Sequence, residues 1–173
     1  MGNRTAVLCR LLLVAGIANA GAHGASAQSA ALPRVRSTHA YIRAMIEEAT
    51  TRSSTLRRLV AAIAETNGIV YVEQGDCGHS VRACLTLSVT PAGDYRFLRV
   101  LVDARQPDWE VMASIGHELQ HALEVLGEPA LKTSESIFLF YVREGLTMGD
   151  SFETPEAIRA GDAVRGEVGA YKR

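Results

Sequence analysis

Two histidines and a glutamate stand at a spacing that could bind a metal ion and use it. His117 and His121 are four residues apart, and Glu118 directly follows the first of them. On an α-helix, side chains four residues apart lie on one face, so both imidazoles can reach a single ion. A carboxylate beside them can take the proton of a water that the metal makes more acidic. The pattern therefore predicts a hydrolytic metal site with a general base, and one ligand is still missing.

The residues on both sides of this pattern predict the helix that it requires. Pro107 suits a first helical turn, and Asp108 and Glu110 place negative charge at the positive end of the helix dipole. Gly127 and Pro129 are typical of a helix end. Apolar residues recur between these limits at helical spacing, namely Trp109, Val111, Met112, Ile115, Leu119, Ala122, Leu123 and Leu126. The alternative, an amphipathic helix that binds no metal, leaves both histidines and the glutamate unexplained.

Residues 1–27 have the features of a secretory signal peptide. Arg4 and Arg10 supply positive charge, and the apolar stretch 11–18 is followed by small residues. This stretch is too short to cross a bilayer comfortably, which argues against the alternative of an uncleaved membrane anchor. We expect cleavage after Ala27 and an exported protein, periplasmic or secreted, with no stable membrane span after cleavage.

The two cysteines beyond the signal predict a disulfide. Cys77 and Cys84 form an even set in a chain expected to be exported, where disulfides persist. A loop this short contributes about 2.5 kcal/mol in the chain-entropy model. The alternative is that both cysteines bind a second metal together with His79, but an oxidising compartment favours the bridge.

The charge balance argues against nucleic acid as a partner. Cleavage of the signal removes two of the 18 basic residues and none of the 19 acidic ones, which leaves a net charge of −3. The sequence has no basic run or basic face of the kind that binds phosphates. We expect a peptide or protein partner instead.

The order of the predicted elements indicates an α+β fold, with a single domain at 38–173 preceded by a short segment at 28–37. Two helices open it, and a small antiparallel sheet precedes the helix of the histidines and two further helices. The expected bounds are a helix at 38–49, a helix capped by Ser53 or Ser54, strands at 69–72, 82–90 and 95–103, the helix from Pro107, a helix from Ser134, and a helix from Pro155 to about Val168.

The pattern His117-Glu118-Leu119-Gln120-His121 is the HExxH motif of the zincin metallopeptidases, and the order of elements around it resembles theirs. The chain is most similar to the gluzincin branch, in which a glutamate from a later helix is the third zinc ligand. The metzincin branch does not fit, because Glu124 and Gly127 stand where its pattern has glycine and histidine. The resemblance covers about residues 69–167. It implies that an edge strand, either 82–90 or 95–103, aligns an extended peptide above the zinc.

The resemblance also points to the missing ligand. Glu153 opens the segment Glu153-Thr154-Pro155-Glu156-Ala157, which is similar to the gluzincin ligand motif, where small residues pack the glutamate's helix against the HExxH helix. The segment departs from that motif, since Glu156 replaces a small residue and Ala157 an acidic one. We therefore expect His117, His121 and Glu153 to bind Zn²⁺, while Glu124, Glu135 and Glu144 remain alternative third ligands.

Two supporting roles follow from the same chemistry. Glu124 is the expected hydrogen-bond partner of His121, because zinc-binding histidines usually donate their other ring N–H to a carboxylate or carbonyl. A developing oxyanion needs a hydrogen-bond donor, for which Tyr141 is favoured while Tyr95, His39 and Arg143 remain alternatives.

The function implied by the resemblance is zinc-dependent peptide hydrolysis with Glu118 as the general base. The alternative is a catalytically idle zinc-binding module of the cell envelope that binds a protein partner. A third reading, a disulfide-pinned structural protein without metal, requires that the histidines are not ligands.

Overall fold

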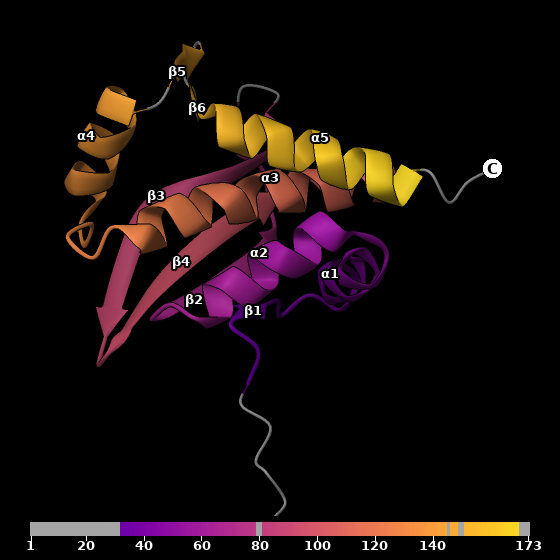
Figure 1. Cartoon of the computed structure of the whole chain (residues 1–173), viewed down its shortest axis with the longest axis horizontal. Helices are drawn as coiled ribbons and strands as arrows, with labels where there is room; N and C mark the ends of the chain where they lie inside the picture. Colours follow the sequence, from indigo (N-terminus) through magenta and orange to yellow (C-terminus); the bar gives the residue numbers. More distant parts are fainter. Residues whose placement is uncertain (1–31, 79–80, 145, 149–150, 170–173) are drawn as a thin grey trace, which may run out of the picture. The chain divides into compact units, whose positions relative to one another are not determined.

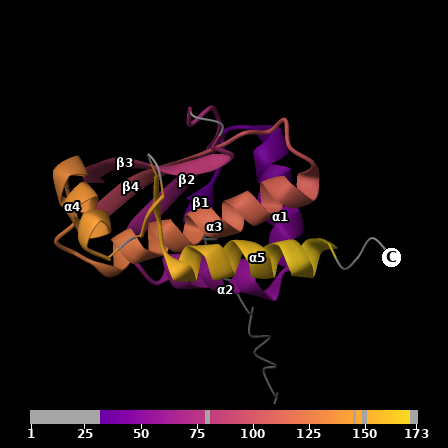
Figure 2. The ribbon, with the colours of Figure 1, turned by 90° about the horizontal axis from the view of Figure 1, so that it is seen from above.

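A mixed β-sheet with helices packed on one face forms the described part of the chain (Figure 1, Figure 2). The computed structural model describes residues 32–78, 81–144, 146–148 and 151–169; the predicted signal peptide and His79 lie outside them. The helices are α1 (Ala40–Arg52), α2 (Ser54–Ala64), α3 (Asp108–Gly127), α4 (Ser134–Glu144) and α5 (Pro155–Gly169). The strands are β1 (Val35–Arg36), β2 (Gly68–Gln74), β3 (Ala83–Ala92), β4 (Tyr95–Val102), β5 (Leu146–Met148) and β6 (Ser151–Glu153). None of the described helices has the length and apolar character that crossing a membrane requires.

The α+β class is confirmed, but the prediction of an antiparallel sheet was wrong. The strand order is β1-β2-β4-β3, with β4 parallel to β2 and antiparallel to β3. The predicted hairpin of β3 and β4 is present, and Gly93 takes a positive φ of 58° in its turn. The loop at 75–82 is long enough to carry β3 to the sheet edge. The hairpin then returns β4, whose inward residues are buried, to the central position.

The alternation that the sequence shows in β3 determines which face meets the core. Leu85, Leu87 and Val89 pack against the core, while Thr86 and Ser88 alternate with them. The register shifts between Leu85, opposite Val100, and Val89, opposite Leu98, so that β3 has two more residues than β4 in this stretch. An insertion of two residues leaves the side-chain alternation unchanged, so the apolar set stays on the inner face.

The helices α2 and α3 pack on one face of the sheet, α5 packs on the outer side of α3, and α1 and α4 lie at opposite ends of the sheet (Figure 1, Figure 2). The helices α3 and α5 approach each other closely. A Cβ atom on Gly116 would lie 2.6 Å from Cγ2 of Val164, and one on Gly161 would lie 3.2 Å from Cβ of His117. These two glycines therefore permit the contact that brings the start of α5 beside the histidines.

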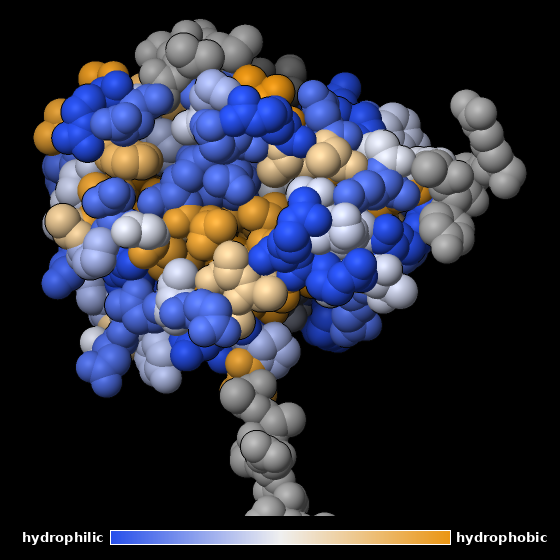
Figure 3. Space-filling model, viewed as in Figure 1, coloured by the Kyte–Doolittle hydropathy of each residue, from blue (hydrophilic) through white to orange (hydrophobic). Residues whose placement is uncertain are grey.

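Apolar side chains also reach the outer side of the helical layer. The space-filling view shows them near the boundary of α2 and α3, surrounded by polar residues (Figure 3). Val60 of α2 and Leu123 of α3 are partly buried and pack against the core.

The ends of two helices are held by side chains. Ser53 caps α2, as predicted, because its hydroxyl accepts a hydrogen bond from Leu56 N at 2.9 Å. Arg96 is only 4% exposed and donates to the carbonyl oxygens of Leu126 at 2.6 Å and Glu128 at 2.8 Å at the end of α3. A cation at a helix C-terminus satisfies carbonyls that have no partner within the helix. Arg96 thus ties the sheet to the helix of the histidines.

Three smaller features complete the fold: a disulfide, the short strand β1 and the hairpin of β5 and β6. The predicted disulfide is present between Cys77 and Cys84, with Cα atoms 6.0 Å apart. The strand β1 adds Val35 and Arg36 to the sheet, although the sequence placed them before the domain. The hairpin of β5 and β6 was not predicted, because three-residue strands are too short to show a period.

Candidate metal centre

The helix α3 presents its two histidines to the same side. The ring centroids of His117 and His121 lie 4.9 Å apart. The His121 side chain is 5% exposed and that of His117 is 21% exposed, so the pair lies at the rim of the core. Buried apolar residues on the opposite side of α3 fix this orientation.

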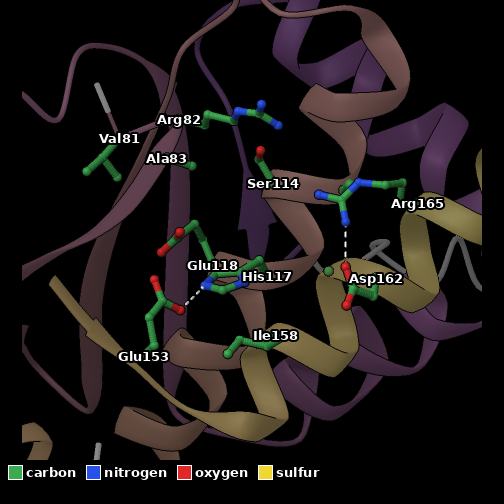
Figure 4. A pocket seen from close by; sticks show the side chains of 12 residues that line it. Val81, Arg82, Ala83, Ser114, His117, Glu118, Glu153, Ile158, Asp162 and Arg165 are labelled. Atoms are coloured by element: carbon green, nitrogen blue, oxygen red, sulfur yellow. Dashed lines mark hydrogen bonds and ion pairs between the residues drawn. The ribbon is translucent and has the colours of Figure 1, made fainter. Parts of the chain in front are cut away.

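Glu153 reaches the histidines from a separate segment. It is the last residue of β6, whereas the sequence suggested that it opens the helix that follows. Its Oε2 atom lies 2.9 Å from Nε2 of His117 and 3.7 Å from Nε2 of His121. The hairpin and the start of α5 thus bring a carboxylate to the imidazole of His117 (Figure 4) and to that of His121 beside it.

The three side chains fit a metal ion. Their ligand atoms all lie within 4.8 Å of one another. A tetrahedral ion with bonds of about 2.0–2.1 Å holds its ligand atoms roughly 3.3 Å apart, and the two histidine–glutamate distances lie on either side of this value. Nε2 of His121 and Oε2 of Glu153 are buried and make no well-directed hydrogen bond in the described part of the chain, although Oε2 lies within ion-pair distance of Nε2 of His117. Such atoms are rare unless a ligand satisfies them, so His117, His121 and Glu153 could hold a metal.

The charges of this group depend on one another. Burial alone would raise the pKa of Glu153, but His117 and His121 lower it to about 2. Burial alone would lower the pKa of His121, but the carboxylates of Glu124 and Glu153 raise it to about 9. The site therefore favours an ionised carboxylate facing a cation, whether a proton or a metal supplies that charge.

Glu118 lies beside the group and is held by the sheet. Its side chain is buried, and Oε2 accepts a hydrogen bond from the backbone N–H of Leu85 in β3 at 2.6 Å. Burial raises the pKa of Glu118 above its ordinary value, although the nearby histidines oppose this shift. A raised pKa moves a carboxyl toward the range in which it can both accept and release a proton near neutral pH.

Glu124 contacts one of the two histidines and also the residue that follows Glu153. Oε2 lies 3.0 Å from Nδ1 of His121, and Oε1 accepts a hydrogen bond from the hydroxyl of Thr154 at 2.8 Å. Thr154 follows Glu153 and also caps α5, because its hydroxyl accepts from Ala157 N at 3.1 Å. Burial alone would raise the pKa of Glu124, but the hydrogen bonds from His121 and Thr154 lower it.

The two glutamates of α4 lie away from the three ligand atoms, whereas the ring of Tyr141 packs edge-on against that of His121, with ring centroids 5.4 Å apart. Glu135 and Glu144 are exposed on α4, and Glu144 pairs with Arg143. Tyr141 is buried, and its hydroxyl donates to the backbone carbonyl of His121 at 3.1 Å. A role for Tyr141 as an oxyanion donor does not fit this position, since its proton is engaged by the backbone of α3.

A pocket of about 500 Å³ opens beside the candidate metal centre (Figure 4). Sites for small ligands and peptide side chains have volumes of this order. The lining residues come from α3, α5, Glu153 and the start of β3, and they include His117 and Glu118. Sequence reasoning missed Arg82, Ser114 and Arg165, which also line the pocket. They come from three elements, and no local pattern relates them.

Comparisons with protein-family models, with curated proteins and with solved structures found no match for this chain. Its function is therefore inferred from the chemistry of the site.

Proposed function

We propose that this chain is a zinc-dependent peptidase of the gluzincin type. His117, His121 and Glu153 would hold the metal, and Glu118 would act as the general base. One observation carries the proposal: the ligand atoms of His117, His121 and Glu153, which come from two separate segments, all lie within 4.8 Å of one another. Export is part of the proposal, because the disulfide suits an oxidising compartment.

The residues around the ligands support hydrolysis rather than a structural role alone. A zinc ion in this site supplies Lewis acidity, which lowers the pKa of a water molecule and polarises a carbonyl oxygen. Glu118 takes the proton from the attacking water and passes it to the amine that leaves. The N–H of Leu85 keeps the Glu118 carboxylate beside the pocket for this task. A purely structural site has no need of such a base.

The sheet topology supports β3 as the strand that aligns the substrate. Both edges of β4 are paired, with β2 and β3, whereas β3 lies at the edge of the sheet. Ala83 of β3 lines the pocket, and Leu85 of the same strand contacts Glu118. An extended peptide that adds to this edge would carry its backbone past Glu118.

The test combines metal content with hydrolysis of an unfolded protein substrate. We expect about one zinc per chain by elemental mass spectrometry, and loss of that zinc in His117→Ala and Glu153→Ala. The Glu118→Gln variant should retain zinc and lose hydrolysis by about 10²- to 10⁴-fold. Glu135→Gln, an exposed change on α4, is the matched control and should keep both properties.

The outcomes separate the proposed function from its alternatives. Failure of the chain to retain zinc when it is supplied would overturn the proposal and leave a structural protein. Stoichiometric zinc without hydrolysis of any unfolded substrate would favour the catalytically idle module. An active Glu118→Gln variant would exclude Glu118 as the base.

A further inference from the structure

Carboxylates gather at one end of the pocket beside the candidate metal centre, and two arginines, each paired with a carboxylate, gather at the other. Glu118 and Glu153 lie at one end, and Arg82 and Arg165 lie at the other (Figure 4). Ser114 of α3 lies on the wall between them. A substrate that occupied the whole pocket would therefore meet cationic side chains at a distance from the ligands.

The two arginines share one buried carboxylate. Oε2 of Glu110 lies 3.1 Å from Nη1 of Arg82 and 3.2 Å from Nη2 of Arg165. The Glu110 side chain is 12% exposed. Arg165 is also paired with Asp162, so two carboxylates hold its guanidinium. The ion pair of Arg165 with Glu110 thus fixes the carboxylate to which Arg82 binds.

Arg82 has donors to spare for a ligand. Its side chain is 64% exposed, and Glu110 is the one carboxylate that it contacts among the described residues. A guanidinium has five N–H groups, and its planar fork matches a carboxylate. The backbone of Arg82 is fixed as well, because its carbonyl accepts from Asp103 N at 2.9 Å and from the side chain of Gln106 at 3.1 Å. A fixed backbone with an exposed guanidinium suits recognition of an anion.

The distance from the arginine end of the pocket to the histidines indicates which substrate residue would lie there. Glu110 and His117 are seven residues apart on α3, which corresponds to about 10 Å along the helix axis. Each residue of an extended peptide covers roughly 3.3 Å. A group bound at Arg82 would therefore belong to a residue about three positions from the bond above the metal.

We propose, resting on the peptidase function above, that Arg82 binds a substrate carboxylate about three residues from the scissile bond, with Glu110 and Arg165 holding it in place. The carboxylate comes either from an acidic side chain or from the C-terminus of the peptide. Substrates with a neutral residue at this point lose the paired hydrogen bonds.

The experiment measures peptide binding and cleavage separately. The probes are blocked eight-residue alanine peptides with a fluorescent label and a single glutamate moved along the sequence, each matched by a glutamine peptide. We expect the glutamate peptide of the right spacing to bind about tenfold more tightly by fluorescence anisotropy, and this advantage to shrink in high salt. An all-alanine peptide with a free C-terminus at the same spacing tests the second source of the carboxylate.

Variants of exposed arginines show whether Arg82 carries the preference. Arg82→Gln should bind both peptides alike, and Arg82→Lys should restore part of the difference, because lysine keeps the charge and loses the fork. Arg105→Gln is the matched control, since Arg105 is 78% exposed and pairs with Asp103 outside the pocket. It should keep the full preference.

The outcomes distinguish this proposal from the proposed peptidase function. A glutamate preference lost in Arg82→Gln supports the carboxylate site even if no peptide is cleaved, in which case the peptidase proposal fails alone. Cleavage with equal rates and equal affinities for the glutamate and glutamine series, together with no tighter binding of the peptide with a free C-terminus, overturns the carboxylate site alone. A preference that persists in Arg82→Gln also overturns it.

Discussion

The hydroxyl of Thr154 donates a hydrogen bond to the carboxylate of Glu124 at 2.8 Å and so joins the helix of the two histidines to the residue after Glu153. The same carboxylate contacts Nδ1 of His121 at 3.0 Å. Glu124 therefore orients one expected ligand directly and holds the segment of another. Such outer contacts fix the ring orientation of a metal-binding histidine and raise its basicity.

Glu124→Gln should weaken zinc binding about 10- to 100-fold without abolishing it. The amide keeps the shape of the side chain and loses the charge that orients His121. Competition with a chromophoric zinc chelator measures the affinity. Glu128→Gln, an exposed change just beyond the same helix, serves as the control and should bind zinc like the parent protein. Equal affinities of the Glu124 variant and the parent would show that the contact does not tune the site.

The stability of the metal-free protein should fall as the pH rises from about 6.5 to 9. Burial alone would lower the pKa of His121, but Glu124 and Glu153 raise it to about 9, above the value of an unfolded chain near 6.5. A raised histidine pKa stabilises the fold fully below the unfolded pKa, and this stabilisation is lost as the pH passes the folded pKa. Thermal unfolding of chelator-treated protein between pH 5 and 9.5 measures the effect.

The His121→Asn variant is the comparison for this titration, because it has no proton to lose in that range. Its melting temperature should change less between pH 6.5 and 9 than that of the parent protein. Parallel curves for the two proteins would contradict the assignment of the alkaline loss to His121.

Arg96→Met should lower the free energy of unfolding by about 3–5 kcal/mol. The substitution removes the guanidinium that donates to the buried carbonyl of Leu126 and to the partly buried carbonyl of Glu128 at the end of α3. Urea unfolding measures the loss. Arg99→Met changes an exposed arginine of the same strand and should stay within about 0.5 kcal/mol of the parent. Similar losses in both variants would mean that the cap at the end of α3 contributes little.

Gly116→Ala should destabilise the protein by about 1–3 kcal/mol, because the added methyl group would lie 2.6 Å from Cγ2 of Val164 and push α5 from α3. Gly166→Ala offers the opposite case on α5. Nothing lies within 4 Å of a Cβ there, so alanine should stabilise the helix by about 0.5–1 kcal/mol. Thermal unfolding of both variants checks the signs, and a stabilised Gly116→Ala would show that the helices can separate freely.

Local patterns predicted α3 and β3, which carry His117, His121, Glu118 and its partner Leu85, but not the strand β6 that carries Glu153. The residues around the histidines predicted a helix that begins at Pro107, one residue before the observed start of α3. In β3 the apolar residues Leu85, Leu87 and Val89 alternate with polar ones, and they are the residues that pack against the core. Cys77 and Cys84 were paired by count and compartment. The strand order was not predictable in this way, because the same hairpin can add to β2 by either of its strands.

The candidate site, like the fold, has a part that local spacing predicts and a part that only packing decides. The spacing of His117, Glu118 and His121 alone determined that two imidazoles and a carboxylate share one region of a helix, because helix geometry is local. The resemblance of its segment to a ligand motif favoured Glu153 among four glutamates, but only the tertiary structure brings Glu153 to the histidines, since this depends on how closely α5 packs on α3 through Gly116 and Gly161. The convergence of Arg82, Glu110 and Arg165 is also a property of packing alone, because these residues come from three elements whose relative positions no short-range pattern encodes.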